Sequence, residues 1–200
     1  MGKAVDYFFS PISPWTYLGH ERFAEIARRH GASINAKPAD FGKIFAVSGG
    51  VPVAKRAPQR QAYRLAELKR FRDYLKLPLN LQPKFFPAPA DLAAQFIVAA
   101  GRDGGSAAAM RLAGALLRAC WAEERNIADV ATVAAICAEQ GFDAARLAGA
   151  AQSEAVKAEY AANTQQAIES NLFGAPSYVI DGEIFWGQDR LDFLTRRLGA

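Results

Sequence analysis

Strand-forming residues lie only near the two ends of this chain, and no other feature restricts its fold as much. Residues 4–9, Ala-Val-Asp-Tyr-Phe-Phe, and residues 34–37 predict two strands in the first forty residues. Residues 177–180 and 183–186 predict two more, joined by an Asp-Gly dipeptide that is typical of two-residue hairpin turns. Between residues 45 and 150 there is no strand signal. A sheet in this protein must therefore be assembled from both ends of the chain.

Helical patterns fill the rest of the sequence. The first helix is expected to begin at Ser13-Pro14, because serine is a favoured N-cap and proline a favoured first helical residue, and to stop at Gly31. A final helix is predicted over residues 189–198, with Asp189 as its N-cap. The helices predicted between them cover residues 59–75, 91–101, 107–124, 128–141, 143–151 and 153–172.

This order of elements predicts an α/β protein in which the terminal segments share one sheet and a helical block is inserted between them. A β-α-β unit followed much later by a β-hairpin and a last helix is the arrangement of the thioredoxin-like fold. We therefore predict a thioredoxin-like domain from residues 1–44 and 160–200, with a large all-helical insertion domain from residues 45–159. The 200 residues are long enough to bury a core of this kind.

Two motifs are candidates for a functional site. The first, Ser13-Pro14-Trp15-Thr16, starts a helix directly after a strand, where free N–H groups and a partial positive charge stabilise an anion such as a thiolate. Ser13 is equally well explained as a helix cap alone.

The second motif, residues 173–177, runs from a helix into a strand as Phe-Gly-Ala-Pro-Ser. One interpretation is a simple helix stop, glycine followed by proline. The other is a cis Ala175-Pro176 bond that exposes the backbone of Ala175 to a ligand, and this is the geometry we predict.

The positive charge of the chain is concentrated in one segment. The whole chain has 24 basic and 20 acidic residues, for a net charge of +4. Residues 55–76 contain eight bases and two acids and so carry +6. This pattern suits a solvated helix face or the attraction of an anionic small molecule. No nucleic-acid-binding motif accompanies the charge, so we expect no nucleic-acid partner.

Other functional classes find little support in the sequence. Cys120 and Cys137 lie in Ala-rich helical stretches and are expected to be buried thiols. The ten-residue spacing of His20 and His30 fits no zinc motif, so no metal site is predicted. No apolar run approaches the roughly 20 residues of a membrane span, and residues 1–6 lack the features of a secretory leader. We expect a cytoplasmic protein with no membrane partner.

Three stretches of the chain resemble known proteins. Residues 5–19, 172–178 and 185–191 are similar to the matching segments of the 2-hydroxychromene-2-carboxylate isomerases and the kappa-class glutathione transferases, which belong to the DsbA-like branch of the thioredoxin superfamily. The resemblance extends over essentially the whole chain. It implies a DsbA-like fold and glutathione as the cofactor.

The resemblance gives Ser13 the role of holding the glutathione thiol. DsbA-like disulfide oxidoreductases have a Cys-x-x-Cys pair at the positions of Ser13 and Thr16, so this chain is expected to lack dithiol chemistry. An asparagine of the isomerases, in the loop after Gly50, has no clear counterpart here. Lys55 in the same loop is a candidate for binding a carboxylate of glutathione or substrate.

The resemblance also assigns the other end of the glutathione site. The backbone of Ala175 would bind the cysteinyl part, with Pro176 in the cis form. Gln188 and Asp189 would meet the γ-glutamyl end. For the hydrophobic substrate pocket, the side chains of Trp15, Phe45 and Phe85 are expected walls, although each is also a reasonable core residue.

These inferences predict a glutathione-dependent isomerase of an aromatic, 2-hydroxychromene-2-carboxylate-like substrate, acting by reversible addition of a glutathione thiolate stabilised by Ser13. One alternative is a kappa-class-like glutathione transferase or peroxidase on the same scaffold, which would consume glutathione. A second is a non-catalytic glutathione-binding module. The expected partner is a small aromatic carboxylate, and a homodimer is the expected assembly.

Overall fold

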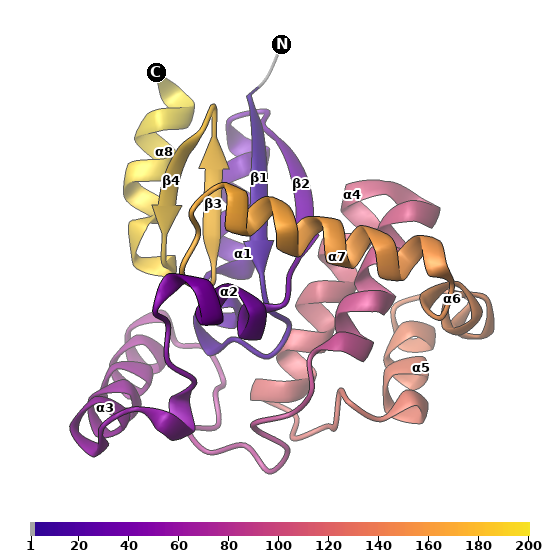
Figure 1. Ribbon diagram of the computed structural model, residues 1–200, viewed down its shortest axis with the longest axis horizontal. Coiled ribbons are helices and arrows are strands. Elements are labelled where there is room, and N and C mark those ends of the chain that lie inside the picture. The colour runs from indigo at the N-terminus through magenta and orange to yellow at the C-terminus, as the bar shows by residue number, and fades with distance from the viewer. Residues whose placement is uncertain (1–2) are drawn as a thin grey trace.

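The computed structural model describes residues 3–200 and contains one four-stranded sheet (Figure 1). The strands are β1 (Ala4–Phe9), β2 (Ser33–Pro38), β3 (Ser177–Ile180) and β4 (Glu183–Trp186), in the order β2-β1-β3-β4. β1 pairs with β2 in parallel and with β3 in antiparallel orientation. The two ends of the chain therefore share one sheet, as the sequence predicts. The first two residues of the predicted 1–44 segment lie outside the described residues.

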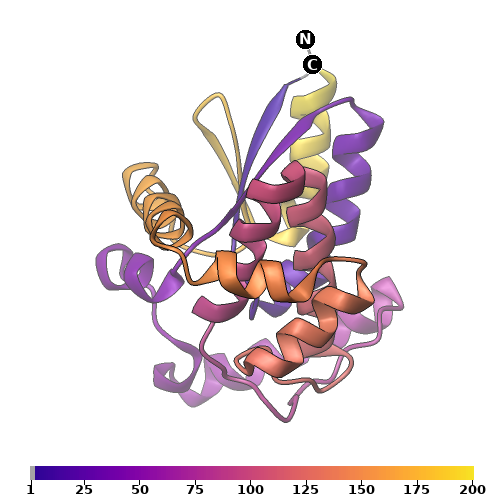
Figure 2. The ribbon, with the colours of Figure 1, turned by 90° about the vertical axis from the view of Figure 1, so that its right-hand side faces the viewer.

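The alternation of side chains along β1 builds a different core on each face of the sheet. Val5, Tyr7 and Phe9 face a large core that also contains residues of α1 (Pro14–Arg29), α4 (Asp91–Trp121) and α8 (Leu191–Gly199). Phe8 faces a smaller core with residues of α2 (Phe41–Ser48) and α7 (Glu154–Glu169). Figure 2 shows the sheet between these two sets of helices.

The middle of the chain is helical, and within residues 3–200 no strand lies between β2 and β3, as predicted. Its remaining elements are a 3₁₀ turn, η1 (Val53–Lys55), and the helices α3 (Pro58–Leu75), α5 (Val130–Glu139) and α6 (Ala144–Ala151). The helices predicted at 91–101 and 107–124 form the single element α4, which is kinked at Gly105 (φ 74°, ψ −173°). Helix α2 was not predicted.

The division into two domains stays a prediction, and its boundaries fall inside α2 and α7. The two cysteines are buried, as expected. Burial raises the pKa of Cys120 to about 12 and that of Cys137 to about 11, so both thiols stay protonated at neutral pH. Across residues 3–200, no helix combines the length and apolar character that crossing a membrane requires.

The predicted N-cap role of Asp189 is wrong. Gly187 has a φ of 102° and turns the chain into a 3₁₀ helix, η2 (Gln188–Arg190), before α8 begins at Leu191. No side chain caps α8, and Asp189 lies inside the 3₁₀ turn with its carboxylate paired to Arg190. An intervening turn of this kind has no clear signature in the sequence, since Asp before an apolar run is also the normal cap pattern.

The first and last described residues lie together. Lys3 Nζ donates to the carbonyl oxygens of Arg197 and Ala200, each at 2.7 Å. Both ends of the described chain, Lys3 and Ala200, therefore lie beside the start of β1, and the C-terminal end of α8 is at the top of Figure 1.

Candidate active site

Three segments that are distant in sequence meet at one end of the sheet. β1 ends at Phe9 and leads into Ser13, whereas β3 runs in the opposite direction and starts at Ser177, which pairs with Phe8. The last residue of β4, Trp186, pairs in turn with Ser177. The strand register thus places three segments at the same end of the sheet: the start of α1, the Ala175-Pro176 peptide and the turn at Gln188.

Ser13 is the N-cap of α1, as predicted. Its Oγ accepts a hydrogen bond from the backbone N–H of Thr16 at 3.2 Å, and Pro14 occupies the first turn. This bond uses an oxygen lone pair and leaves the hydroxyl hydrogen free to donate to a ligand. The cap and the ligand-binding role therefore do not compete. Thr16, three residues further along α1, is fully buried.

The Ala175-Pro176 peptide is cis, as predicted. It joins the end of α7 to β3, and the carbonyl oxygen of Pro176 accepts a hydrogen bond from the backbone N–H of Gly187 at 2.9 Å. Gly174, just before this peptide, lies under the indole of Trp186, and a Cβ at residue 174 would collide with that ring. Close packing of Trp186 onto a glycine thus holds the loop against β4.

Gln188 has a fixed amide orientation. Arg22 of α1 donates from Nη1 to Gln188 Oε1 at 2.7 Å, so the amide NH₂ group must point the other way. That nitrogen is buried and has no partner in the described protein. Gly19 permits this packing, because a Cβ there would lie 2.7 Å from Cβ of Gln188. The arrangement leaves the Gln188 amide nitrogen as an oriented donor without a hydrogen-bond partner in the described protein.

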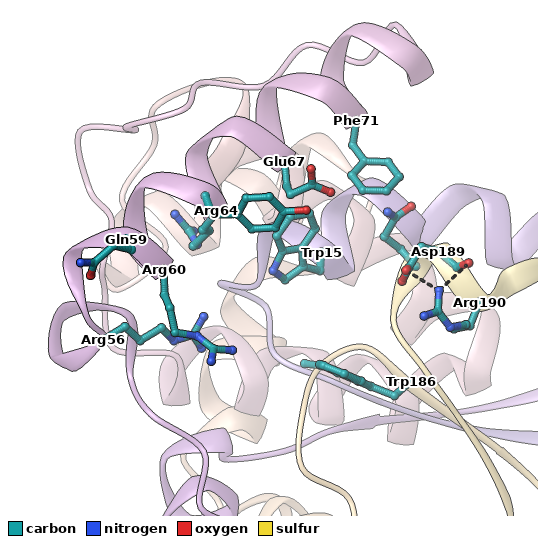
Figure 3. A pocket seen from close by; sticks show the side chains of 13 residues that line it. Trp15, Arg56, Gln59, Arg60, Arg64, Glu67, Phe71, Trp186, Asp189 and Arg190 are labelled. Carbon is teal, nitrogen blue, oxygen red and sulfur yellow. Dashed lines mark hydrogen bonds and ion pairs between the residues drawn. The ribbon is translucent and has the colours of Figure 1, made fainter.

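A cavity of about 530 Å³ lies beside these groups, and Figure 3 shows the side chains around it. Ala175, Gln188 and Asp189 line one part of it. The aromatic residues lining it are Trp15, Tyr63, Phe71 and Trp186. Trp15 and Phe71 form an edge-to-face pair with ring centroids 6.1 Å apart, and Trp186 is 50% exposed. The cavity therefore joins a polar end to an aromatic wall, which suits a planar apolar ligand group.

The opposite wall is basic. Arg56, Arg60 and Arg64 line the cavity at four-residue intervals, Arg56 just before α3 and the other two one turn apart on it (Figure 3). Burial lowers the pKa of Arg56, and it lowers the pKa of Arg64 to about 10, so both remain cations at neutral pH. An anionic ligand is therefore favoured in this cavity.

Only some of the residues predicted from the sequence line the cavity. Trp15, Ala175, Gln188 and Asp189 line it, and Ser13 and Pro176 belong to the segments that bear two of these residues, although neither lines the cavity. Lys55, at the end of η1, is exposed and does not line it. The prediction missed Arg60 and Arg64. Arg60 and Arg64 are four residues apart within the helix predicted over residues 59–75, and this spacing places both on one helix face.

The two other predicted walls lie elsewhere. Phe45 packs in the small core with Phe41, at a centroid distance of 6.1 Å. Phe85 lines a separate, shallower hollow next to Phe86 and Pro87. Neither lines the cavity at the sheet end, and the prediction of these two walls is not supported by the structure.

A buried polar pair lies beneath the site. Tyr7 of β1 contacts His20 of α1, with Oη 3.2 Å from Nδ1, and His20 Nε2 lies 2.9 Å from the carbonyl oxygen of Met110 in α4. A carbonyl accepts only, so Nε2 carries the ring hydrogen and Nδ1 accepts from Tyr7. Burial lowers the pKa of His20 and so keeps the ring neutral. These bonds tie α1 to the sheet below Ser13.

Comparison with known proteins identifies the family. Residues 4–199 match the model of the DSBA-like thioredoxin domain. The chain is 30% identical over 195 residues to 2-hydroxychromene-2-carboxylate isomerase of Sphingobium xenophagum, with 97% of each chain covered. It is 22% identical over 208 residues to glutathione S-transferase kappa 1 of Rattus norvegicus, covering 98% of this chain and 91% of that one.

The fold agrees with these relatives. The solved structure of a selenomethionine 2-hydroxychromene-2-carboxylate isomerase superposes with a TM-score of 0.82 at 25% identity, over 98% of this chain and 94% of that chain. The thioredoxin-like sheet, its helical insertion and the match over nearly the full length lead to one conclusion: the chain belongs to the DsbA-like thioredoxin family.

Proposed function

We propose that this protein is a glutathione-dependent isomerase of an aromatic, 2-hydroxychromene-2-carboxylate-like substrate. One observation carries the proposal: a single cavity joins Ala175 and Gln188, at the sheet end where Ser13 caps α1, to an aromatic wall and a basic wall. The relatives named as 2-hydroxychromene-2-carboxylate isomerases support the same reaction.

The residues at the sheet end fit glutathione, an acidic tripeptide. The buried, unpartnered NH₂ group of Gln188 matches a carboxylate or carbonyl acceptor. The backbone of Ala175 precedes a cis proline at the edge of the cavity and offers hydrogen bonds to a peptide. Ser13 and the backbone N–H of Trp15, in the first turn of α1, would hold the thiol end, and Asp189 the γ-glutamyl end.

Bound glutathione would supply a nucleophilic thiolate for reversible addition to the conjugated substrate and would be released unchanged after isomerisation. Ser13 would donate its hydroxyl hydrogen toward the sulfur and so lower the thiol pKa, together with the N-terminal dipole of α1. Trp15 and Trp186 bracket the aromatic substrate and limit the access of water. The arginine wall attracts the substrate carboxylate.

Product analysis tests this proposal. Purified protein is mixed with 2-hydroxychromene-2-carboxylate and a tenth of an equivalent of glutathione, and the ultraviolet spectrum of the ring-opened isomer is followed. Conversion to the equilibrium mixture is expected, well beyond the tenth of an equivalent that stoichiometric consumption of glutathione would allow, with recovery of free glutathione. No turnover above the protein-free rate contradicts the proposal.

A second function shares the geometry. The similarity to glutathione S-transferase kappa 1 favours a transferase, in which glutathione stays on the product. The same experiment separates the two, because a transferase consumes one glutathione per turnover and stops when the tenth of an equivalent is used.

A further inference from the structure

Arg64 is a buried cation without a protein anion. Its exposed fraction is 8%, although it lies on α3 beside the cavity (Figure 3). Within residues 3–200 it forms no ion pair, and its Nη2 is buried with no hydrogen-bond partner. A buried charge is normally paired, because removing it from water is costly. Arg64 is therefore a buried cation in the cavity wall whose charge no anionic group of the described chain neutralises.

The neighbours of Arg64 hold its guanidinium in place without neutralising it. The group lies 5.3 Å from the ring centroid of Phe86 and 5.8 Å from that of Trp121. These rings stabilise a cation through their π-faces, but they accept none of its N–H hydrogens in the way a carboxylate does. The donors of Arg64 are thus oriented and unused.

The acids at the cavity are already paired with other cations. Glu67, one turn along α3, pairs with Arg70, and Asp189 pairs with Arg190 at 2.5 Å. Arg56 donates from Nε to the carbonyl oxygen of Val51 at 2.7 Å. Arg64 differs from these residues because it is buried and, within the described chain, forms neither an ion pair nor a hydrogen bond through its side chain.

We infer that Arg64 selects the substrate: its guanidinium binds the carboxylate of an aromatic acid whose rings lie against Trp15, Tyr63 and Phe71. This inference about Arg64 adds a substrate-binding residue to the proposed function. It rests on that proposed function only for identifying the aromatic acid as the substrate. Glutathione would bring carboxylates to the same cavity, so Arg64 has two candidate ligands. The aromatic side chains around Arg64 favour the carboxylate of the aromatic acid, and separate titrations with the acid and with glutathione distinguish the two.

The test is calorimetric and needs no turnover. Glutathione-free protein is titrated with 2-naphthoate and with its neutral analogue 2-naphthamide. Arg64→Met keeps an unbranched apolar side chain and removes the charged guanidinium, and Lys69→Met, at an exposed residue of the same helix outside the cavity, is the matched control. Thermal unfolding verifies that each variant is folded.

Arg64→Met is expected to weaken 2-naphthoate binding roughly 10- to 100-fold and to leave 2-naphthamide within about twofold. Arg64→Lys, which keeps the charge without the planar fork, should lose less. If Arg64→Met does not fold, the inference is judged from Arg64→Lys. In that variant the dissociation constant of 2-naphthoate should rise at least about threefold, whereas that of 2-naphthamide should not change. Lys69→Met should match the wild type.

Three outcomes overturn the inference: wild type that does not bind 2-naphthoate, Arg64 variants that bind it normally, and equal weakening of the acid and the amide. If glutathione binding alone weakens in Arg64→Met, the carboxylate belongs to glutathione and the assignment to the aromatic acid is wrong. Absence of isomerase turnover would contradict the proposed function and leave the 2-naphthoate result unaffected.

Discussion

Arg22 fixes the orientation of Gln188 from outside the cavity: its Nη1 lies 2.7 Å from Gln188 Oε1, and this contact turns the amide NH₂ group away from α1. A guanidinium has no acceptor, so the reverse amide orientation would place two donors against each other. The residue predicted to meet glutathione is thus held in position by one that sequence analysis did not select.

Replacing Arg22 by Met is expected to weaken glutathione binding roughly 3- to 10-fold, about the value of one hydrogen bond, because the Gln188 amide becomes free to rotate. Isothermal titration calorimetry measures the change. Arg29→Met, on the exposed end of the same helix, is the control and should bind as the wild type does. Equal dissociation constants for all three proteins would show that the Arg22 contact has no positioning role.

Ser13→Ala should lower kcat roughly 10- to 1000-fold, because the thiolate loses its donor while most contacts of the tripeptide remain. The thiol of bound glutathione should titrate at higher pH, as measured by thiolate absorbance in the ultraviolet. Loss of the cap should also cost about 1 kcal/mol of stability.

Ser13→Asp separates the two roles of this residue. Aspartate accepts the Thr16 N–H bond and keeps the cap, but it has no hydrogen to donate at neutral pH. We expect wild-type stability with activity as low as that of Ser13→Ala. Full activity in either variant would leave Ser13 as a helix cap only.

Lys55→Ala should change KM for substrate less than about twofold, because the side chain is exposed and does not line the cavity. Arg60→Ala, on the basic wall, should raise KM roughly tenfold through loss of a charge-assisted hydrogen bond. Steady-state kinetics at saturating glutathione compares the two. A larger rise in KM for Lys55→Ala than for Arg60→Ala would assign carboxylate binding to Lys55 instead.

His20 should make the fold sensitive to mild acid. Its pKa is lowered in the folded state, so the unfolded chain binds more protons, and stability falls as the pH drops through the ordinary histidine value of about 6.5. The free energy of unfolding should therefore decrease between roughly pH 7.5 and pH 5.5, by at most about 1.4 kcal/mol per pH unit.

Urea unfolding at several pH values measures this dependence. His20→Gln should flatten the curve, whereas His30→Gln, at the only other histidine and exposed, should retain it. An unchanged slope in His20→Gln would assign the effect to other groups.

The strands and the Ser13 cap could be predicted because each depends on local sequence preferences. The cis Ala175-Pro176 bond was predicted from the expected ligand-binding role of the Ala175 backbone, because local sequence favours the trans form. Arg64 and Gln188 depend on packing between distant elements. Arg64 is buried only because α3 packs beside Phe86 and Trp121, and Gln188 only because Arg22 of α1 lies across from it. A basic helix segment in isolation gives no sign that one of its arginines is inside the protein.

The bonds from Lys3 to the carbonyl oxygens of Arg197 and Ala200 have a practical consequence. They hold both ends of the described chain at the start of β1, whereas the cavity lies beyond the other end of that strand. A surface linker or a fused domain at either end would leave the cavity accessible to its ligands. The same proximity suits circular permutation, with a short peptide joining the two ends and new ends opened in a loop of the helical insertion.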